Sequence, residues 1–361
     1  MSDPRWQQLA DVLVNYSTRT RRGEKVLISM MEETTFPLAR TVHAEVVKAG
    51  GLPHVEFQSV LLERDLMLHG AEEQLDWVPE LSAYGMQWAD VYVGLRGARN
   101  PFEFSGVSPD RLAAHKRSLG RVSAMRNEMT RWVLVRVPNE SFAQQAQMSH
   151  DEIMDFFFSA TLRDWQQEGE RYREIQKPFE AASTVRIVGR DTDLTFSTVG
   201  RTYEVADGRL NMPDGEIFTS PVDDSAEGRI SFEFPGVYFG QRVPGIALEF
   251  EAGRLVKATA SENEELLHQL TQMDEGASRI GEFGVGLNYG IDRFCHDILY
   301  DEKIGGTIHI ALGRAYAECG GVNDSALHWD IIKDLREEGA IYLDGEKVFE
   351  NGAFLVPKAR D

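Results

Sequence analysis

The pattern of apolar residues changes near Lys177-Pro178, and this change most limits the folds open to the chain. Before that point, short apolar runs typical of buried strands alternate with stretches of helical spacing. Strands interleaved with helices predict a parallel sheet covered by helices, an α/β architecture. The predicted strands of this half include residues 23–29, 53–57, 90–95 and 132–137.

After the change, the apolar segments are shorter and are joined by tight turns at residues 191–193, 252–253 and 344–345. Alternation of apolar and polar residues is typical of strands with one buried face, and tight turns join antiparallel neighbours. Asp344-Gly345, between Ile341-Tyr-Leu and Lys347-Val-Phe, is a strong hairpin signal. The second half is therefore predicted to be an α+β, antiparallel-rich domain.

The length of the chain also favours two domains, because 361 residues exceed what one core usually holds. A long charged helical stretch begins at His150, and we expect Lys177-Pro178 to end it, because proline disfavours helix at the residue before it. We predict an α/β domain over residues 1–178 and an α+β domain over residues 179–361.

Charge excludes several classes of partner. The chain carries 58 acidic and 38 basic residues, a formal net charge of -20, which repels phosphate backbones and anionic lipid surfaces. No run of 18 apolar residues occurs, and the N-terminus lacks the basic and apolar regions of a signal peptide. We expect a cytoplasmic protein that binds neither nucleic acid nor membranes.

Ionisable side chains occur in four strand-like segments of the second half, where apolar residues are expected. A buried charge must be paired or bind a metal, and a mixture of carboxylates and imidazoles suits Zn²⁺, Co²⁺ or Mn²⁺. His328 and Asp330 would share one face of a strand, because side chains at i and i+2 point the same way. The candidate ligands in these segments are Glu216, Glu282, His309, His328 and Asp330.

Each candidate also has a purely structural interpretation. Taken alone, Glu216 is more typical of a paired structural acid and His309 of a hydrogen-bonded core histidine. Tyr316 is compatible with a packed aromatic residue whose hydroxyl is hydrogen-bonded. The glycines of residues 284–290 have the wrong spacing for a dinucleotide site, and no Gly-x-Ser-x-Gly motif occurs, which disfavours nucleophilic hydrolases.

Taken in order, Met-Pro-Asp-Gly-Glu, Arg-Ile-Gly-Glu-Phe, His-Ile-Ala-Leu-Gly-Arg-Ala-Tyr and Leu-His-Trp-Asp resemble motifs of the aminopeptidase T family of metallopeptidases. The resemblance implies two domains, a homodimer enclosing an inner cavity, and a dinuclear site with two divalent metal ions. Carried over by motif, the metal-site residues are Glu216, Glu282, His309, Tyr316, His328 and Asp330.

The function that this resemblance implies is a cytoplasmic metallo-aminopeptidase, a hydrolase that releases N-terminal residues from short peptides with a water activated by two metals. Glu282 would move the proton of the water towards the leaving amine. Tyr316 would either bind a metal or donate a hydrogen bond to the developing oxyanion.

Two alternatives stay open at the level of sequence. The same fold is similar to that of mononuclear metalloenzymes of aromatic catabolism, of the dihydroxypyridine ring-cleaving dioxygenase or nitroanthranilate hydrolase type. A non-catalytic binding protein that keeps only the cavity is the other alternative. Metal content per chain, measured alongside turnover of peptides and of aromatic compounds, separates the three hypotheses.

Overall fold

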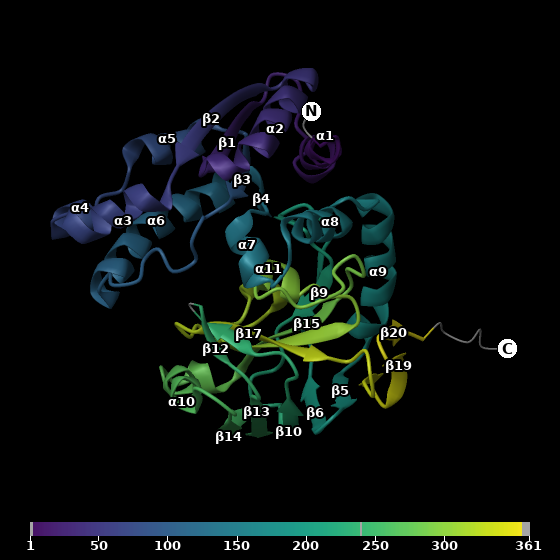
Figure 1. Ribbon diagram of the computed structural model, residues 1–361. Helices are drawn as coiled ribbons and strands as arrows, with labels where there is room; N and C mark the ends of the chain where they lie inside the picture. Colours follow the sequence, from purple (N-terminus) through teal and green to yellow (C-terminus); the bar gives the residue numbers. More distant parts are fainter. Residues whose placement is uncertain (1–2, 239, 356–361) are drawn as a thin grey trace. The chain divides into compact units, whose positions relative to one another are not determined.

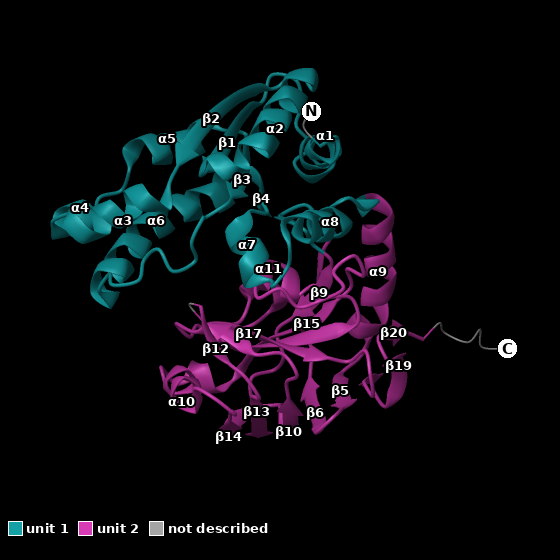
Figure 2. Ribbon diagram, viewed as in Figure 1, with its two compact units in different colours: residues 1–165, 208–214 teal, residues 166–207, 215–361 magenta. Residues whose placement is uncertain are grey.

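The computed structural model describes residues 3–238 and 240–355. Two compact units share them: residues 1–165 with 208–214, and residues 166–207 with 215–361 (Figure 2). The chain therefore leaves the first unit, returns to it for a short segment, and leaves again. The assignment of domains to residues 1–178 and 179–361 stays a prediction.

The first unit contains a five-stranded parallel sheet in the order β2-β1-β3-β4-β8 (Figure 1). All four strands predicted for this half are present, and the returning segment adds the fifth. The strands are β1 (Lys25–Met31), β2 (Leu52–Gln58), β3 (Val91–Arg96), β4 (Arg131–Arg136) and β8 (Asn211–Met212).

Helices connect these strands, as parallel pairing requires. Where a helix starts, a side chain often satisfies its free N–H groups: Ser59 accepts from the backbone of Leu61, and Asn139 from that of Phe142. The helices are α1 (Arg5–Asp11), α2 (Phe36–Lys48), α3 (Val60–His69), α4 (Glu72–Leu75), α5 (Glu80–Trp88), α6 (Pro109–Met129), α7 (Glu140–Gln145) and α8 (His150–Thr161).

The long helix expected to start at His150 and end at Lys177-Pro178 is wrong in two respects. The chain breaks after α8, where the indole N–H of Trp165 donates to the carbonyl of Thr161 and so satisfies an end of that helix. A second helix, α9 (Trp165–Ala181), then continues past Pro178. A proline inside a helix removes one hydrogen bond, which this helix tolerates near its end.

The second unit contains two antiparallel sheets, which confirms the predicted antiparallel-rich architecture. The larger has the order β14-β13-β10-β6-β5-β18-β19-β20. Its strands are β5 (Thr184–Gly189), β6 (Thr192–Ser197), β10 (Glu227–Ser231), β13 (Ala247–Glu251), β14 (Arg254–Thr259), β18 (Ala340–Leu343), β19 (Glu346–Glu350) and β20 (Ala353–Phe354).

The smaller sheet of this unit has the order β17-β16-β15-β9-β7. Its strands are β7 (Glu204–Ala206), β9 (Glu216–Thr219), β15 (Ile280–Gly286), β16 (Thr307–Gly313) and β17 (His328–Asp334). A separate ribbon, β11 (Gly236–Tyr238) with β12 (Gln241–Val243), and two helices, α10 (Glu264–Thr271) and α11 (Ile298–Asp301), complete the unit.

The larger and the smaller sheet of the second unit pack against each other through aromatic side chains. Phe283 of β15 meets Phe196 of β6 with ring centroids 5.1 Å apart, and Phe179 of α9 lies 6.4 Å from the same ring. Because side chains alternate along a strand, the neighbours of Phe283 must point to the opposite face of the smaller sheet. That opposite face carries the candidate site.

The predicted hairpin at Asp344-Gly345 is confirmed, since β18 and β19 pair as antiparallel neighbours on either side of it. Both turn residues have positive φ, 49° at Asp344 and 87° at Gly345. A two-residue type I′ hairpin turn requires positive φ at both positions. The Asp344 carboxylate also accepts hydrogen bonds from the backbone of Ser183 and Thr184, at the start of β5. Among the described residues, no helix is long and apolar enough to cross a membrane.

Candidate metal centre

Five of the six predicted ligands lie on four neighbouring strands of the smaller sheet. Strands β17, β16, β15 and β9 are consecutive in that sheet, although β9 and β17 are more than a hundred residues apart in the chain. The strands carry Glu216 on β9, Glu282 on β15, His309 on β16, and both His328 and Asp330 on β17.

The strand register puts these side chains on one face. Glu282 is paired with Ala311, and Ala311 with Asp330, so the two acids flank the same position of β16. His309 precedes Ala311 by two residues, and His328 precedes Asp330 by two, so both imidazoles point to that face. Glu216 joins them because it is paired with Gly286, four residues beyond Glu282 on β15.

The rest of this face consists of very small residues. Gly284, Gly286, Ala311 and Gly313 alternate with the apolar residues that face the other sheet. A Cβ at Gly284 would lie 2.0 Å from Cε1 of His309, so the imidazole occupies the space that a side chain would take. Gly284, one of the glycines that have the wrong spacing for a nucleotide site, therefore makes room for the imidazole.

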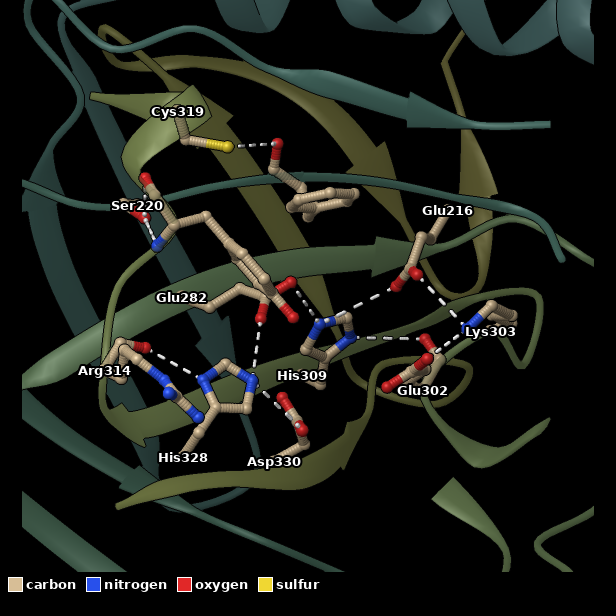
Figure 3. A network of polar contacts seen from close by, with 12 residues as sticks. Glu216, Ser220, Glu282, Glu302, Lys303, His309, Arg314, Cys319, His328 and Asp330 are labelled. Atoms are coloured by element: carbon tan, nitrogen blue, oxygen red, sulfur yellow. Dashed lines mark hydrogen bonds and ion pairs between the residues drawn. The ribbon is translucent and has the colours of Figure 1, made fainter. Parts of the chain in front are cut away.

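Glu282 lies between the two imidazoles (Figure 3). Its Oε1 is 3.3 Å from Nε2 of His309, and its Oε2 is 3.3 Å from Nε2 of His328. Nε2 of His328 also lies 3.5 Å from Oδ2 of Asp330, and Nε2 of His309 lies 3.7 Å from Oε2 of Glu216. One nitrogen of each ring thus faces the group of carboxylates.

The other nitrogen of each imidazole is held by the backbone. Nδ1 of His309 donates to the carbonyl of Glu302 at 3.2 Å, and Nδ1 of His328 donates to the carbonyl of Arg314 at 2.8 Å. A carbonyl can only accept, so these contacts place a proton on Nδ1. Metal-binding histidines usually have such a partner, which leaves Nε2 to face the ion.

Glu282 and the imidazoles shift each other's pKa. Burial alone raises the pKa of Glu282, but hydrogen bonds from His309 and His328 outweigh it and lower the pKa to about 2. Burial alone lowers the pKa of each imidazole, but the Glu282 hydrogen bond and the nearby carboxylates raise the pKa of His309 to about 10 and of His328 to about 9. Without a metal, therefore, both imidazoles are doubly protonated and positively charged at neutral pH.

The other two acids differ from Glu282. Burial raises the pKa of Glu216 to about 8, against the opposing charge of Lys303. Burial also raises the pKa of Asp330 to about 6, against the opposing charge of His328. These two groups pay the cost of burial without enough positive charge nearby, which a bound cation would supply.

The geometry of the donor atoms also supports a site for a divalent cation. Among the described residues, Oε2 of Glu216 and Oδ1 of Asp330 are buried and accept no hydrogen bond. Donor atoms of Glu282, His309 and Asp330 all lie within 4.8 Å of one another. Buried polar atoms are nearly always satisfied, so the unused oxygens mark places for a ligand. Oxygen and nitrogen donors together suit Zn²⁺, Co²⁺ or Mn²⁺.

Tyr316, the sixth predicted residue, follows β16 at the start of a short 3-10 turn. Its ring lies 5.3 Å from that of His328 between centroids, with the rings nearly edge to face. Its backbone N–H donates to the hydroxyl of Ser220, which anchors the segment beside β9. Burial raises the pKa of Tyr316 well above its usual value, so the phenol keeps its proton.

Two residues that the sequence does not single out also contact this group. Lys303 is fully buried, and its Nζ lies 3.2 Å from Oε1 of Glu216 and contacts the carboxylate of Glu302. Glu302 in turn supplies the carbonyl that holds His309. In the sequence they belong to the charged run Asp301-Glu302-Lys303, which is typical of a solvated turn, so no local signal reveals that Lys303 is buried.

Fold and site together define a class of protein: a two-unit metalloenzyme with a buried carboxylate–imidazole centre on an antiparallel sheet. The chain belongs to the M29 family of thermophilic metalloproteases, whose sequence model matches residues 2–354. The protein is therefore a metallopeptidase, a hydrolase that acts on peptides with the help of a divalent metal. The resemblance inferred from the four motifs is confirmed.

Several characterised relatives align over nearly the whole chain. Aminopeptidase PepS of Streptococcus thermophilus is 24% identical over 97% of this chain and 98% of its own length. Aminopeptidase 2 of Geobacillus stearothermophilus is 25% identical over 96% of this chain and 98% of its own length. Aminopeptidase T of Thermus thermophilus is 24% identical over 97% of this chain and 98% of its own length.

Solved structures with the same fold include AmpT from Thermus thermophilus, with a TM-score of 0.84 and 22% identity over 98% of this chain and 99% of that one. The 2,5-dihydroxypyridine dioxygenase of Pseudomonas putida KT2440 is more distant, with a TM-score of 0.60 and 14% identity over 98% and 97%. Both similarities concern the fold, which two different kinds of chemistry share.

Proposed function

We propose that this protein is a metal-dependent aminopeptidase that releases N-terminal residues from short peptides. The observation that carries the proposal is the position of Glu282, a buried carboxylate held between two Nε2 atoms whose rings are fixed by backbone carbonyls. Family membership supports peptides as substrates, and the named relatives are aminopeptidases.

The proposed cofactor is a pair of divalent ions, Zn²⁺, Co²⁺ or Mn²⁺, in one dinuclear site. Six side chains that supply oxygen and imidazole nitrogen form it, more than a single tetrahedral ion needs. Bound there, the ions would lower the pKa of a water molecule and polarise the carbonyl of the peptide bond. The proposed ligands are Glu216, Glu282, His309, Tyr316, His328 and Asp330.

The side chains divide the remaining work. Glu282 would accept the proton of the attacking water and pass it to the leaving amine, because its carboxylate lies between the two imidazoles at the centre of the donor group. Tyr316 would either bind a metal or, with its phenol proton kept, donate a hydrogen bond to the oxygen that becomes negative. Lys303 keeps Glu216 paired on the side away from the imidazoles. The free α-amine of the substrate would be held by a carboxylate of this site, which restricts cleavage to the first residue.

The test combines metal content with turnover. We expect about two ions per chain, loss of leucyl-p-nitroanilide hydrolysis on chelation, and recovery with cobalt, zinc or manganese. Glu282→Gln should lower kcat by roughly a hundredfold or more while the fold is kept, whereas Glu251→Gln, on an exposed part of β13, should have no effect. A metal-loaded protein that leaves a broad panel of peptides intact would contradict the proposal.

A mononuclear enzyme of aromatic catabolism is the second candidate, favoured by the fold shared with the dihydroxypyridine dioxygenase. One iron or manganese ion per chain, with turnover of a hydroxypyridine or an aminobenzoate, would support it. We further propose that residues 179–361 form the catalytic domain, and that the protein is a cytoplasmic homodimer that binds neither nucleic acid nor membranes. Sedimentation tests the homodimer and the absence of bound nucleic acid. Subcellular fractionation tests the cytoplasmic location and the absence of membrane binding.

A further inference from the structure

The parallel sheet of the first unit has two unlike faces. One face is apolar and fully buried: Val26, Ile28, Val93, Val133 and Val135 all have no exposed surface. Because side chains alternate along a strand, the residues between them point to the opposite face. That face is more polar, since it carries Ser29, Glu56 and Arg96 beside the apolar Leu27 and Leu134, and helices α3, α5 and α6 accompany it.

A cavity of about 600 Å³ lies on this polar face. It is lined by β1 to β4 and by α3, α5 and α6, all within the first unit. It adjoins the apolar cluster that contains Leu27, Met86, Tyr92 and Val122. Its volume is in the range of pockets that hold small molecules.

The cavity lies where ligands usually bind in open parallel sheets. The chain passes from β1 to β2 on one side and from β2 to β3 on the other side of β1, so the strand order reverses next to β1. Ser29 and Met31 of β1, and Gly94 and Arg96 of β3, line the cavity from the carboxyl-terminal halves of these strands. A Cβ at Gly94 would lie 2.4 Å from Cδ2 of Leu134, so glycine at this position lets the side chain of Leu134 pack over β3 beside the cavity.

Acidic and imidazole groups that have atoms without a hydrogen-bond partner line one part of the cavity. Oε2 of Glu56, on the edge strand β2, is buried and accepts no hydrogen bond from the described residues. His115 of α6 is only 6% exposed, and its Nε2 likewise has no hydrogen-bond partner there. The nearest acid to that nitrogen is Glu63, at 3.9 Å, and it also lines the cavity.

Cationic groups without an acidic partner line another part. The Arg126 guanidinium lies over the ring of Trp132, 4.6 Å from its centroid, and its hydrogen bonds go to the amide oxygen of Asn127. Neither Arg126 nor Arg96 forms an ion pair with a carboxylate among the described residues, although both line the cavity. Burial lowers the pKa of Arg126, the expected sign for a cation that lacks an anion.

We propose that this cavity binds a small zwitterion, namely a free α-amino acid or dipeptide with an apolar side chain. Its ammonium group would pair with Glu56 and its carboxylate with Arg126 and Arg96. In the register, Glu56 is opposite Ser29 and Ser29 opposite Gly94, two strand spacings or about 10 Å of backbone, which both kinds of long side chain reach into. Met86, Leu119 and Val122 would contact the apolar side chain.

This inference goes beyond the peptidase assignment, since it concerns a site in the other unit. Calorimetric titration of the full chain with L-leucine should show a binding event that persists in the metal-free Glu282→Gln variant, which separates it from binding of leucine at the metal centre. L-leucinamide lacks the carboxylate and 4-methylpentanoate lacks the ammonium group. In the Glu282→Gln variant each should bind at least roughly tenfold more weakly than leucine, because each leaves one charged wall unpaired.

Two variants locate the site. Glu56→Gln and Arg126→Gln should each weaken leucine binding roughly tenfold to a hundredfold, with thermal unfolding as the check on folding. Arg121→Gln, on the same helix but paired with Asp76 outside the cavity lining, should bind leucine as the parent does. The proposal is overturned if leucine does not bind at millimolar concentration, if both cavity variants bind like the parent, or if the two analogues bind as tightly as leucine.

Discussion

The imidazole of His309 lies against Gly284 of the neighbouring strand, where a Cβ would come within 2.0 Å of its Cε1. The two residues are direct partners in the register of β15 and β16. A glycine opposite the histidine therefore decides where the ring, and with it Nε2, can lie. The site therefore depends on glycine at position 284 as well as on its donor side chains.

Gly284→Ala should displace His309 and lower metal affinity and kcat roughly tenfold to a hundredfold, because ligand orientation is lost while all the donors remain. Metal titration and peptide hydrolysis measure the effect. Gly120→Ala is the matched control, since a Cβ at that helical position of α6 meets nothing within 4 Å. The control should be neutral or stabilising by about 1 kcal/mol; equal activity of the two variants would refute the role assigned to Gly284.

Lys303→Met should lower activity as well as stability. Lys303 and Lys333 are both fully buried, and each contacts a glutamate: Lys303 lies 3.2 Å from Glu216, and Lys333 lies 2.6 Å from Glu233. Removing Lys303 leaves the buried Glu216 without its cation and should cost about 3 to 5 kcal/mol in the free energy of unfolding. Lys333→Met should cost less, because the side chain of Glu233 is 27% exposed and water can solvate its carboxylate. Only Lys303→Met should also change metal affinity, because only its partner belongs to the site.

Denaturant unfolding and metal titration of the two lysine variants separate these effects. Lys333→Met should keep the metal affinity and kcat of the parent in its folded fraction. If both variants lose metal binding to the same degree, the loss reflects general destabilisation, and Lys303 has no special part in the site.

Metal binding should become tighter as the pH rises. In the metal-free protein the pKa of His328 is about 9 and that of His309 about 10, so both rings are protonated at pH 7. A metal binds only the neutral ring, so at that pH about two protons must leave the imidazoles. Affinity should therefore increase with pH up to the pKa values and level off above them. Calorimetry in buffers of different ionisation enthalpy counts the protons; His328→Ala should release one fewer.

Asp274→Asn should loosen the segment that leads into β17. The Asp274 carboxylate accepts hydrogen bonds from the Ser325 hydroxyl at 2.7 Å and from the backbone N–H groups of Ala326 and Ala277 at 2.8 and 2.9 Å. The asparagine amide has one accepting oxygen, where the carboxylate has two. The variant should therefore lose about 1 to 2 kcal/mol of stability. Glu275→Gln, whose side chain is 81% exposed, should change stability by less than about 0.5 kcal/mol.

The same contacts predict a pH dependence of stability. The Ser325 hydrogen bond, followed by those of the backbone, lowers the pKa of Asp274 below its ordinary value. A lowered pKa contributes stability that is present above the unfolded-state pKa and is lost as the pH falls through the folded-state pKa. The stability difference between the parent and Asp274→Asn should therefore shrink below about pH 4. A difference that is constant into strong acid would show that Asp274 is not responsible.

Local periodicity was enough to predict much of this protein. Four strands of the first unit, the hairpin at Asp344-Gly345, and the common face of His328 and Asp330 all depend on residues close together in the chain. The break between α8 and α9 was not predictable in this way, because it depends on an indole reaching back to the end of the preceding helix.

Only the tertiary structure decided that the site exists as one group. Strand order and register bring Glu216 and Glu282 within reach of His309, and no local pattern encodes pairing between strands so distant in sequence. The burial of Lys303 inside a charged turn, and the need for glycine opposite His309, likewise come from packing between segments. The sequence by itself determined which chemical groups are available; the fold decided which of them meet, because a donor set is a matter of distances across the sheet.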